Sequence, residues 1–381
     1  MKNITKHWAL FLACLIFSIL SLHYLAEAPV YAGDSLRYLN AATEWLNFGS
    51  ISGKAANYRG YVLFVAGIQY LFGMETGGLL ALTYAQTIVL GLSLICLYDI
   101  GLRLHSPFAA GVTVLLFAAN YYAIRWVPFI LTESLFTAMV IISCWVCLAS
   151  IKKPVWLFIV LPVIAMTAFT RPNGLIVLPL FIGFLILRHT GIVRISLVVI
   201  CAAVVALLVT FIPNDLERTA SQESLLSQFE NGNVIYGVES IPMPKLANAS
   251  GSTLLDVSRY VLTYPLESSV LVSKRLFASW SWYRQNYSFK HQIFLGSVIP
   301  MLYILALVGL FKGNANRRIG FYLPLIIIGA QTAVIGISFA NHDHRFINYI
   351  MPLVFVYAGV GAVMMLNLLC SKITPMRSNQ F

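Results

Sequence analysis

The sequence is poor in charged residues. Charged residues make up 10% of its 381 residues and hydrophobic residues 59%, and the mean hydropathy is +0.81. A soluble protein of this size carries roughly 25% charged residues, because water must solvate its surface. The composition therefore excludes an ordinary soluble globular protein and indicates that most of the surface faces lipid.

Acidic residues are scarcer than basic ones: 14 Asp and Glu stand against 25 Lys and Arg, and the formal net charge is +11. The basic residues come in ones, twos and threes between apolar runs and form no continuous stripe. That distribution is typical of membrane orientation rather than of nucleic-acid binding. We expect a lipid bilayer as partner and no nucleic acid.

Cysteines are absent from the segments that we place outside the membrane. All six lie in or beside apolar runs, at Cys14, Cys96, Cys144, Cys147, Cys201 and Cys370. Cys144 and Cys147 have a C-x-x-C spacing, which invites a redox or metal interpretation. They lie within a predicted span without a polar partner nearby, so we interpret them as buried hydrophobes and expect no disulfide framework.

Long apolar runs occupy most of the chain. Roughly 20 helical residues cover the hydrocarbon core, and these runs are too long for the strands of a barrel. They predict about ten transmembrane helices, at 8–25, 78–100, 107–127, 134–150, 154–170, 172–188, 192–212, 291–311, 319–339 and 346–369. Lys2 and Lys6 before the first run imitate a signal peptide, but the run is long for one, and we interpret it as an uncleaved span. The predicted fold class is an all-α polytopic membrane protein, with residues 1–381 as one integral membrane domain.

Residues 60–73 are apolar but short for a span, at about 14 residues, and they suit a helix at the membrane interface. This interpretation puts the Lys152-Lys153 and Arg317-Arg318 pairs on the same side as both termini. The positive-inside rule makes that side cytoplasmic. Among the acidic residues only Asp99 then lies near the inner face, so we expect the chemistry on the outer face.

Two large regions lie outside in this topology. Residues 26–77 contain an expected amphipathic helix from Ser35 to about Phe48, with Gly49 as its stop. Residues 213–290 form a polar loop that is too small for a well-packed independent domain. No internal repeat is found, so the inverted symmetry common in secondary transporters is not evident.

Asp34 is the first candidate for chemistry, because charged residues at a membrane interface are costly and mark functional sites. It follows the first span and directly precedes the expected amphipathic helix. An Asp in that place can cap the helix by accepting hydrogen bonds from free backbone N–H groups, or it can act as a catalytic base. Its position does not choose between the two roles, and one residue could serve both.

The residues around Asp34 resemble the first outer loop of the GT-C glycosyltransferases. The similar segments are GDSLRY at 33–38, NYRGYVLF at 57–64 and LFG at 71–73. The branch in question contains aminoarabinose transferase and protein O-mannosyltransferases, bacterial membrane enzymes that move a sugar from a polyprenyl-phosphate carrier to an acceptor on the outer face. The family places two juxtamembrane helices after the Asp, and then an RPPGYP-like turn, where this chain has the sequence YRGY.

Three later segments resemble the same family. LTES at 131–134 is similar to its TE or LD element in the second outer loop, and TRPNG at 170–174 is similar to a turn between two later spans. HRF at 344–346 resembles the opening of its last span. The resemblance covers residues 1–190 and 340–370.

The resemblance implies two catalytic candidates, Asp34 and Glu133. Asp34 would take the proton of the acceptor hydroxyl. Glu133 is a second orienting group or a metal ligand, or only an acid that the dipole of a helix start favours. Cations would stabilise the leaving lipid phosphate, and the candidates for this are Arg59, Arg345, His344, Arg171 and Arg37. Two of these have a structural alternative, since Arg171 can cap a helix hairpin and Arg37 can pair with Asp34.

No cofactor is predicted with certainty, and a divalent metal at Glu133 stays open. The segment Asn341-His342-Asp343-His344 looks like a metal cluster, but four adjacent residues on one loop rarely converge on one ion without further ligands. We therefore interpret this segment as a solvated loop.

The leading hypothesis is a glycosyltransferase of the bacterial inner membrane with a polyprenyl-phosphate-linked sugar donor and a glycan, lipid or protein as acceptor. An alternative is a surface-polysaccharide polymerase or ligase, for which residues 213–290 are large enough, although Asp34 and the paired juxtamembrane helices favour the transferase. A non-enzymatic lipid or sugar transporter would have charges near mid-membrane and broken paired spans. Here the charges cluster at the outer interface instead.

Overall fold

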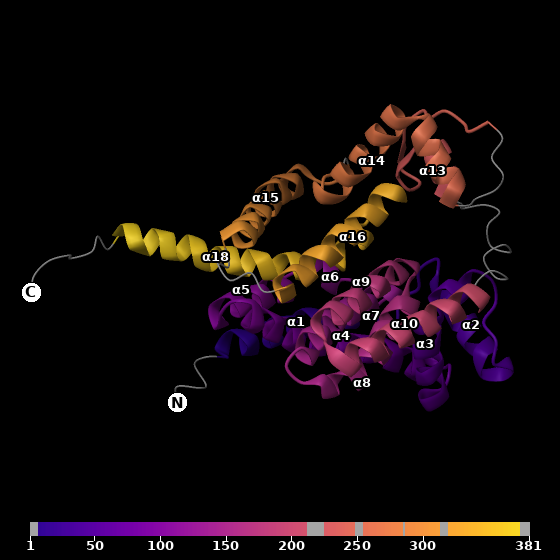
Figure 1. Ribbon diagram of the computed structural model, residues 1–381, viewed down its shortest axis with the longest axis horizontal. Coiled ribbons are helices and arrows are strands. Elements are labelled where there is room, and N and C mark those ends of the chain that lie inside the picture. The colour runs from indigo at the N-terminus through magenta and orange to yellow at the C-terminus, as the bar shows by residue number, and fades with distance from the viewer. Residues whose placement is uncertain (1–6, 212–224, 248–253, 285, 313–318, 374–381) are drawn as a thin grey trace, which may run out of the picture.

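Helices form nearly all of the chain in the computed structural model, which describes residues 7–211, 225–247, 254–284, 286–312 and 319–373 (Figure 1). The first half contains α1 Trp8–Leu25, α2 Ser35–Phe48, α3 Arg59–Phe72, α4 Thr76–Leu104, α5 Pro107–Ala118, α6 Tyr121–Ile124, α7 Thr132–Ser150, α8 Leu157–Thr170, α9 Pro172–Arg188 and α10 Gly191–Phe211. The second half contains α12 Leu225–Glu230, strands β1 Asn233–Ile235 and β2 Glu239–Ser240, α13 Leu254–Thr263, α14 Pro265–Trp280, α15 Phe289–Lys312, α16 Leu323–Ile337, α17 Arg345–Asn348 and α18 Met351–Ile373. Lys2, Lys6 and the Arg317-Arg318 pair lie outside the described residues.

Six of the described helices are long and apolar enough to cross a membrane: α1, α4, α7, α15, α18, and α16 together with the turn before it. Shorter apolar helices comprise α5, α9, and α8 with its preceding turn. The prediction of an all-α polytopic membrane protein is confirmed. The predicted amphipathic helix is also present as α2, and it stops at Gly49, whose φ of +67° is the left-handed conformation that glycine adopts readily.

In two of the predicted spans the helix is interrupted by a break, so that a short separate turn stands beside the main helix. The helix predicted at 107–127 ends at Ala118, and the short α6 follows after a break. The buried Gln86 side chain of α4 donates to the carbonyls of Val127 (3.0 Å) and Phe129 (2.6 Å), which holds this stretch outside a helical ladder. The helix predicted from 346 begins at Met351, because α17 forms a separate turn before it.

The described part of residues 213–290 is folded, in contrast to the polar loop that we expected. Helices α12, α13 and α14 and the antiparallel β1–β2 pair enclose a small apolar cluster. Its central residues are Phe229, Val234, Tyr260 and Leu271, and Ala340, which follows α16, completes it. This region therefore packs against α16, while its apolar cluster is separate from the main core.

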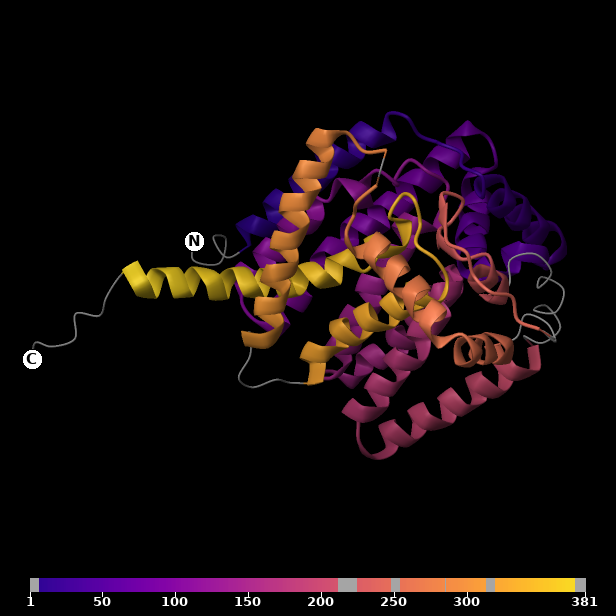
Figure 2. The same cartoon turned by 90° about the horizontal axis from the view of Figure 1, so that it is seen from above.

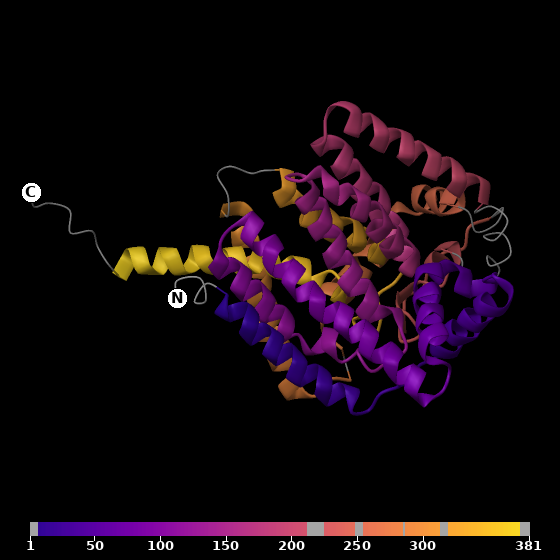
Figure 3. The same cartoon turned by 90° about the horizontal axis from the view of Figure 1, so that it is seen from below.

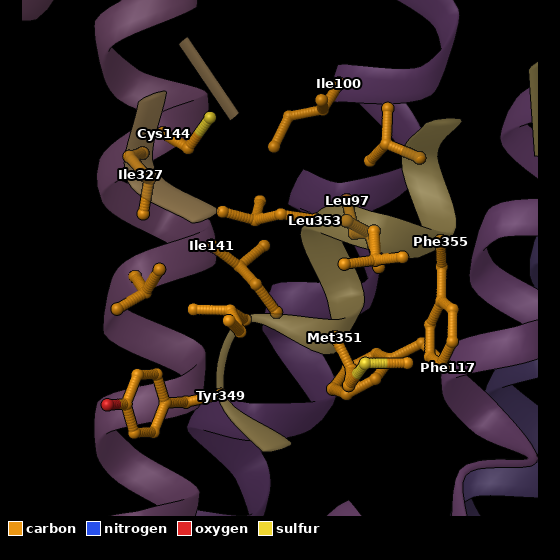
Figure 4. Packing of buried hydrophobic residues seen from close by; sticks show 14 of the residues in the cluster. Leu97, Ile100, Phe117, Ile141, Cys144, Ile327, Tyr349, Met351, Leu353 and Phe355 are labelled. Atoms are coloured by element: carbon orange, nitrogen blue, oxygen red, sulfur yellow. The ribbon is translucent and has the colours of Figure 1, made fainter. Parts of the chain in front are cut away.

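The main core lies where α4, α5, α7, α16 and α18 meet (Figure 4). Both cysteines of the C-x-x-C pair are buried there, and no disulfide joins cysteines within the described residues. Helix α15 crosses α18 (Figure 2) so closely that a Cβ atom on Gly361 would lie 1.9 Å from the Leu305 carbonyl oxygen. Only glycine fits at that crossing.

The two ends of the bundle differ in character. Helices α2 and α3 lie at one end, and the C-terminal half of α18 extends beyond the other, while α1 packs along α4 (Figures 1 and 3). At the end away from α2, the Trp145 indole N–H donates to Asp99 Oδ2 (2.7 Å), and Ser150 Oγ lies 3.5 Å from His189 Nε2. The basic residues gathered at this end include Arg103, Lys152, Lys153 and Arg188. The loops around residues 103, 152 and 188 therefore share one end of the bundle.

Candidate functional site

The segment after α1 pairs with the segment before α7. The backbone N–H of Ile130 donates to the Val30 carbonyl (3.1 Å), and Ser35 Oγ donates to the Ile130 carbonyl (2.9 Å). These contacts tie the start of α2 to the start of α7. They therefore bring Asp34 and Glu133, the two predicted catalytic acids, to the same end of the bundle although nearly a hundred residues separate them in the chain.

Asp34 occupies the N-cap position of α2, but its side chain makes no capping hydrogen bond. Its Oδ1 instead forms an ion pair with Arg37 Nη1 at 3.1 Å, and the two side chains are 35% and 37% exposed. The pairing of Arg37 with Asp34 that the sequence suggested is thus present. Asp34 keeps a second carboxylate oxygen and remains reachable from outside the protein.

Glu133 stands in a different environment, because it is buried and held by two arginines. Its Oε1 accepts hydrogen bonds from Arg171 Nη1 at 2.8 Å and from Arg345 Nε and Nη2 at 2.7 and 2.5 Å. The Glu133 side chain is 5% exposed, and its Oε2 has no partner among the described residues. Two guanidiniums stabilise the charged carboxylate, so Glu133 is better suited to hold the arginines than to carry a proton.

Arg171 is placed by the TRPNG turn, which it occupies in extended conformation between α8 and α9, with Pro172 as the first residue of α9. Its guanidinium also lies over the rings of Phe346 (5.4 Å) and Tyr349 (5.9 Å). Arg171 is therefore part of the hairpin turn through its backbone and part of the Glu133 network through its side chain.

The Arg345 guanidinium reaches the same carboxylate from the first residue of α17 and lies 5.2 Å from the Trp126 ring. Its side chain is 21% exposed, against 7% for Arg171. Arg345 is thus the outer and more exposed of the two arginines.

A tyrosine cluster connects α3 to this network. The Tyr38 ring lies 5.2 Å from Tyr58 and 5.0 Å from Tyr61. Burial raises the pKa of Tyr38 above its ordinary value, and the nearby negative charges of Glu133 and Asp34 add to the effect. The Tyr38 hydroxyl therefore stays protonated beside the two carboxylates.

Arg59 begins α3 and is half-buried. A Cβ atom on the next residue, Gly60, would lie 2.8 Å from the backbone of Phe169 and Thr170, so the start of α3 rests directly on the residues before Arg171. A cavity of about 410 Å³ lies between α1 and α4 and one of about 200 Å³ beside α15, and neither is lined by Arg59 or Arg345. That Arg59 and Arg345 share a cavity stays a prediction.

His344 does not fit the predicted role of a phosphate-binding cation. It is 2% exposed and its ring stacks on Trp282 at 4.6 Å. Burial, followed by the nearby charges of Arg284 and Arg125, lowers the pKa of His344 to about 2. The imidazole is therefore neutral at any physiological pH and screened from a ligand.

The loop before α17 is also less solvated than expected. Asp343 is exposed, but Arg125 Nη2 donates to its carbonyl at 2.9 Å. Across the described residues, no group of three or more His, Cys, Asp or Glu side chains is placed to hold a metal ion. The question of a metal at Glu133 is therefore left to experiment.

Sequence reasoning missed several residues of this site. Tyr38 lies one helical turn after Asp34, a spacing that places both on one face of α2. This spacing could have identified Tyr38 as a residue of the site. Arg125 and Trp126, whose side chains stack at 4.9 Å, stand in the second outer loop as an adjacent cation and aromatic residue. Arg284 lies in a region without a recognisable motif, and nothing in the sequence pointed to it.

Comparisons with known proteins agree with the resemblance seen in the motifs. The family model described as dolichyl-phosphate-mannose-protein mannosyltransferase matches residues 60–215. A comparison with curated protein sequences finds no match.

Solved structures share the fold over the whole chain. The oligosaccharyltransferase AglB from Archaeoglobus fulgidus, solved with an inhibitory peptide and a dolichol-phosphate, aligns with a TM-score of 0.54 and 11% identity over 100% of this chain and 53% of its own. An Archaeoglobus fulgidus oligosaccharyltransferase tethered to an acceptor peptide aligns with a TM-score of 0.57 and 12% identity over 99% and 52% of the two chains. The present chain thus spans about half the length of these proteins. The family match over residues 60–215 and the shared fold are both in keeping with the resemblance seen in the motifs.

Proposed function

We propose that this protein is a glycosyltransferase that moves a sugar from a polyprenyl-phosphate carrier to an acceptor on the outer face of the membrane. The observation that carries the proposal is the difference between the two carboxylates. Glu133 is buried between Arg171 and Arg345, whereas Asp34 is about one-third exposed and pairs with Arg37. One acid is thus placed to organise cations, and the other is free to accept a proton.

The reaction follows from these two environments. An acceptor hydroxyl attacks the anomeric carbon of the carrier-linked sugar, and its proton passes to Asp34. The new bond between the acceptor oxygen and the sugar forms as the bond between the sugar and the phosphate oxygen breaks, so the anomeric configuration is inverted. The products are the glycosylated acceptor and the polyprenyl phosphate.

The leaving phosphate gains negative charge, and guanidiniums stabilise it because they stay protonated and bind two oxygens at once. We assign this role to Arg345 and Arg59. Arg345 is the more exposed arginine of the Glu133 network, and Arg59 begins the helix that rests beside Arg171. Arg171 is the more buried of the two arginines that bind Glu133, and it holds Glu133 in place.

The orientation is part of the same proposal. The end of the bundle that carries Arg103, Lys152, Lys153 and Arg188 faces the cytoplasm, in keeping with the positive-inside rule, and both termini lie there. The site then opens to the outside of a bacterial inner membrane. The family name refers to dolichyl-phosphate-mannose, and the AglB structure contains a dolichol-phosphate; both support a polyprenyl-phosphate carrier here.

The test is sugar transfer by the purified protein in liposomes, from labelled undecaprenyl-phosphate sugars to a membrane extract. Wild-type protein should release undecaprenyl phosphate and label an acceptor. Replacing Arg59 or Arg345 by lysine should weaken carrier binding by about 10-fold, because an ammonium keeps the charge and loses the paired geometry. Carrier binding that tolerates both lysine variants would remove these arginines from the site, and the absence of any sugar release would refute the transferase.

A further inference from the structure

Arg284, which lies between α14 and α15, is a buried arginine that forms no ion pair within the described residues. Its side chain is 3% exposed and donates to four backbone carbonyls. Nε binds the His342 carbonyl at 2.9 Å and Nη2 binds the Asn341 carbonyl at 2.7 Å. Nη1 binds the carbonyls of Ala278 and Tyr283, each at 2.6 Å. A buried charge without a counter-ion is costly, and burial lowers the pKa of Arg284 accordingly.

Two of these carbonyls belong to the loop of residues 341–344, between α16 and α17. Arg125 binds the same loop, since its Nη2 donates to the Asp343 carbonyl at 2.9 Å and lies 3.6 Å from Asp343 Oδ1. Guanidinium groups thus bind three successive carbonyls, those of residues 341, 342 and 343. A loop fixed in this way has little freedom to shift.

The 341–344 loop leads directly into Arg345. His344, its last residue, has a left-handed φ of +58°, which is unusual for a residue other than glycine, and its ring is clamped against Trp282. Arg345 then places Nε and Nη2 at 2.7 and 2.5 Å from Glu133 Oε1. Hydrogen bonds of that length tolerate only a few tenths of an ångström, so the position of Arg345 depends on the loop behind it.

Arg275 of α14 offers a matched comparison, because it is equally buried and also bound only to carbonyls. Its side chain is fully buried and donates to Asn233, Gly336, Ile337 and Gln228. None of these residues belongs to the 341–344 loop. Arg275 therefore joins the segment of residues 225–284 to the end of α16. Arg284 joins the same segment to the loop that leads into Arg345.

From this arrangement we infer that Arg284 is a positioning residue for Arg345. It holds the 341–344 loop so that the Arg345 guanidinium meets Glu133 on one side and the carrier phosphate on the other. The phosphate contact rests on the proposed function, whereas the link from Arg284 through the loop to Arg345 rests on the geometry alone. Arg284 itself, which is buried, is not expected to contact the carrier.

The experiment compares Arg284→Lys, Arg275→Lys, Arg345→Lys and the Arg284→Lys/Arg345→Lys double variant in the full-length protein, with undecaprenyl phosphate as the binding probe. Arg284→Lys should weaken binding by about 10-fold, because a displacement of about 1 Å at a site is expensive. The double variant should bind no more weakly than Arg345→Lys, because the first change acts only through Arg345. Arg275→Lys should lower the melting temperature similarly and leave binding unchanged.

Three results would overturn the inference: an unchanged affinity in Arg284→Lys, additive losses in the double variant, or an equal loss in Arg275→Lys. Should Arg284→Lys fail to fold, Arg125→Gln provides the second test, since its side chain is 22% exposed and it releases the same loop at Asp343. Its loss of affinity must be non-additive with Arg345→Lys, and an additive loss contradicts the inference.

A double-mutant cycle with the melting temperature as its readout tests this inference separately from the proposed function. If wild-type protein does not bind undecaprenyl phosphate, the proposed carrier fails, but the coupling of Arg284 to Arg345 can still be measured. The shift caused by Arg284→Lys should be smaller in an Arg345→Gln background than in the wild type. Equal shifts in both backgrounds would refute the positioning role without reference to any ligand.

Discussion

Replacing Asp34 by asparagine distinguishes a catalytic base from a residue that only stabilises α2. Asparagine keeps the size of the side chain and suits an N-cap position as well as aspartate does. The structural loss is limited to the ion pair with Arg37, whose two side chains are 37% and 35% exposed. Exposed pairs of this kind contribute about 0–1 kcal/mol, so the variant should remain folded and inserted.

The expected loss of activity is much larger than that loss of stability. A neutral amide cannot accept the proton of the acceptor hydroxyl, and a positioned base typically contributes about 10²–10⁴-fold, which is about 3–5 kcal/mol of the barrier. The assay is the turnover of labelled undecaprenyl-phosphate sugar by reconstituted protein, together with the binding of undecaprenyl phosphate. Turnover should fall by that factor while binding of the carrier stays within about 3-fold, since the arginines are unchanged.

Asp99→Asn is the matched control for this experiment. Asp99 is 33% exposed, pairs with an arginine one helical turn later, Arg103, at 2.6 Å, and lies at the opposite end of the bundle. The Asp99 variant should lose at least as much stability, because Asp99 also accepts a hydrogen bond from Trp145 at 2.7 Å, and it should keep its turnover. Near-normal turnover in Asp34→Asn would refute the base, and an equal loss in Asp99→Asn would show that the assay reports folding.

Three further predictions test the network and the topology. Glu133→Gln should destabilise the protein by about 3–5 kcal/mol in detergent unfolding, because it leaves Arg171 and Arg345 without their counter-ion; a loss no larger than that of Asp34→Asn would contradict the network. In a cysteine-free background, a membrane-impermeant maleimide applied from outside should label a cysteine at Val238, which is 61% exposed, and spare one at Lys152; the reverse pattern would overturn the orientation. Because the pKa of His344 falls from 6.5 to about 2 on folding, the unfolded chain binds the extra proton below pH 6.5, and wild-type stability should fall with acidification by up to about 1.4 kcal/mol per pH unit. His344→Phe, which keeps the stack on Trp282, should lose less stability between pH 6.5 and 5 than wild-type protein does, and parallel curves would contradict a buried neutral imidazole.

The helices could be predicted from the sequence because each leaves a local signal. Membrane spans are set by the length of an apolar run, and the end of α2 by the glycine at its C-terminus, Gly49. The helix bounds were predicted wrongly where a residue distant in the sequence binds the backbone. Gln86 of α4 holds the residues after α5 out of a helix through two carbonyls, and no periodicity within residues 107–127 could reveal that contact.

For the candidate site, too, local motifs could be recognised in the sequence but contacts between distant residues could not. The motifs identified Asp34, Glu133, Arg171 and Arg345 as residue types suited to a phosphate and a hydroxyl. They could not show that one carboxylate accepts hydrogen bonds from both arginines, because Glu133 and Arg345 are 212 residues apart in the chain. They also could not show that His344 is buried, since burial depends on Trp282 and on a region without a recognisable motif.

The arrangement around Glu133 also has a consequence for the order in which the protein is made. Synthesis proceeds from the N-terminus, so Glu133 and Arg171 enter the membrane long before Arg345 exists. Until the last spans emerge, the carboxylate has only its bond to Arg171 at 2.8 Å, and the two bonds from Arg345 are missing. The arrival of α17 and α18 completes the network, so a chain that stops after α16 would contain most of the fold and an unfinished site. The Glu133 network therefore cannot be completed before α17 has been synthesised, however early the first helices fold.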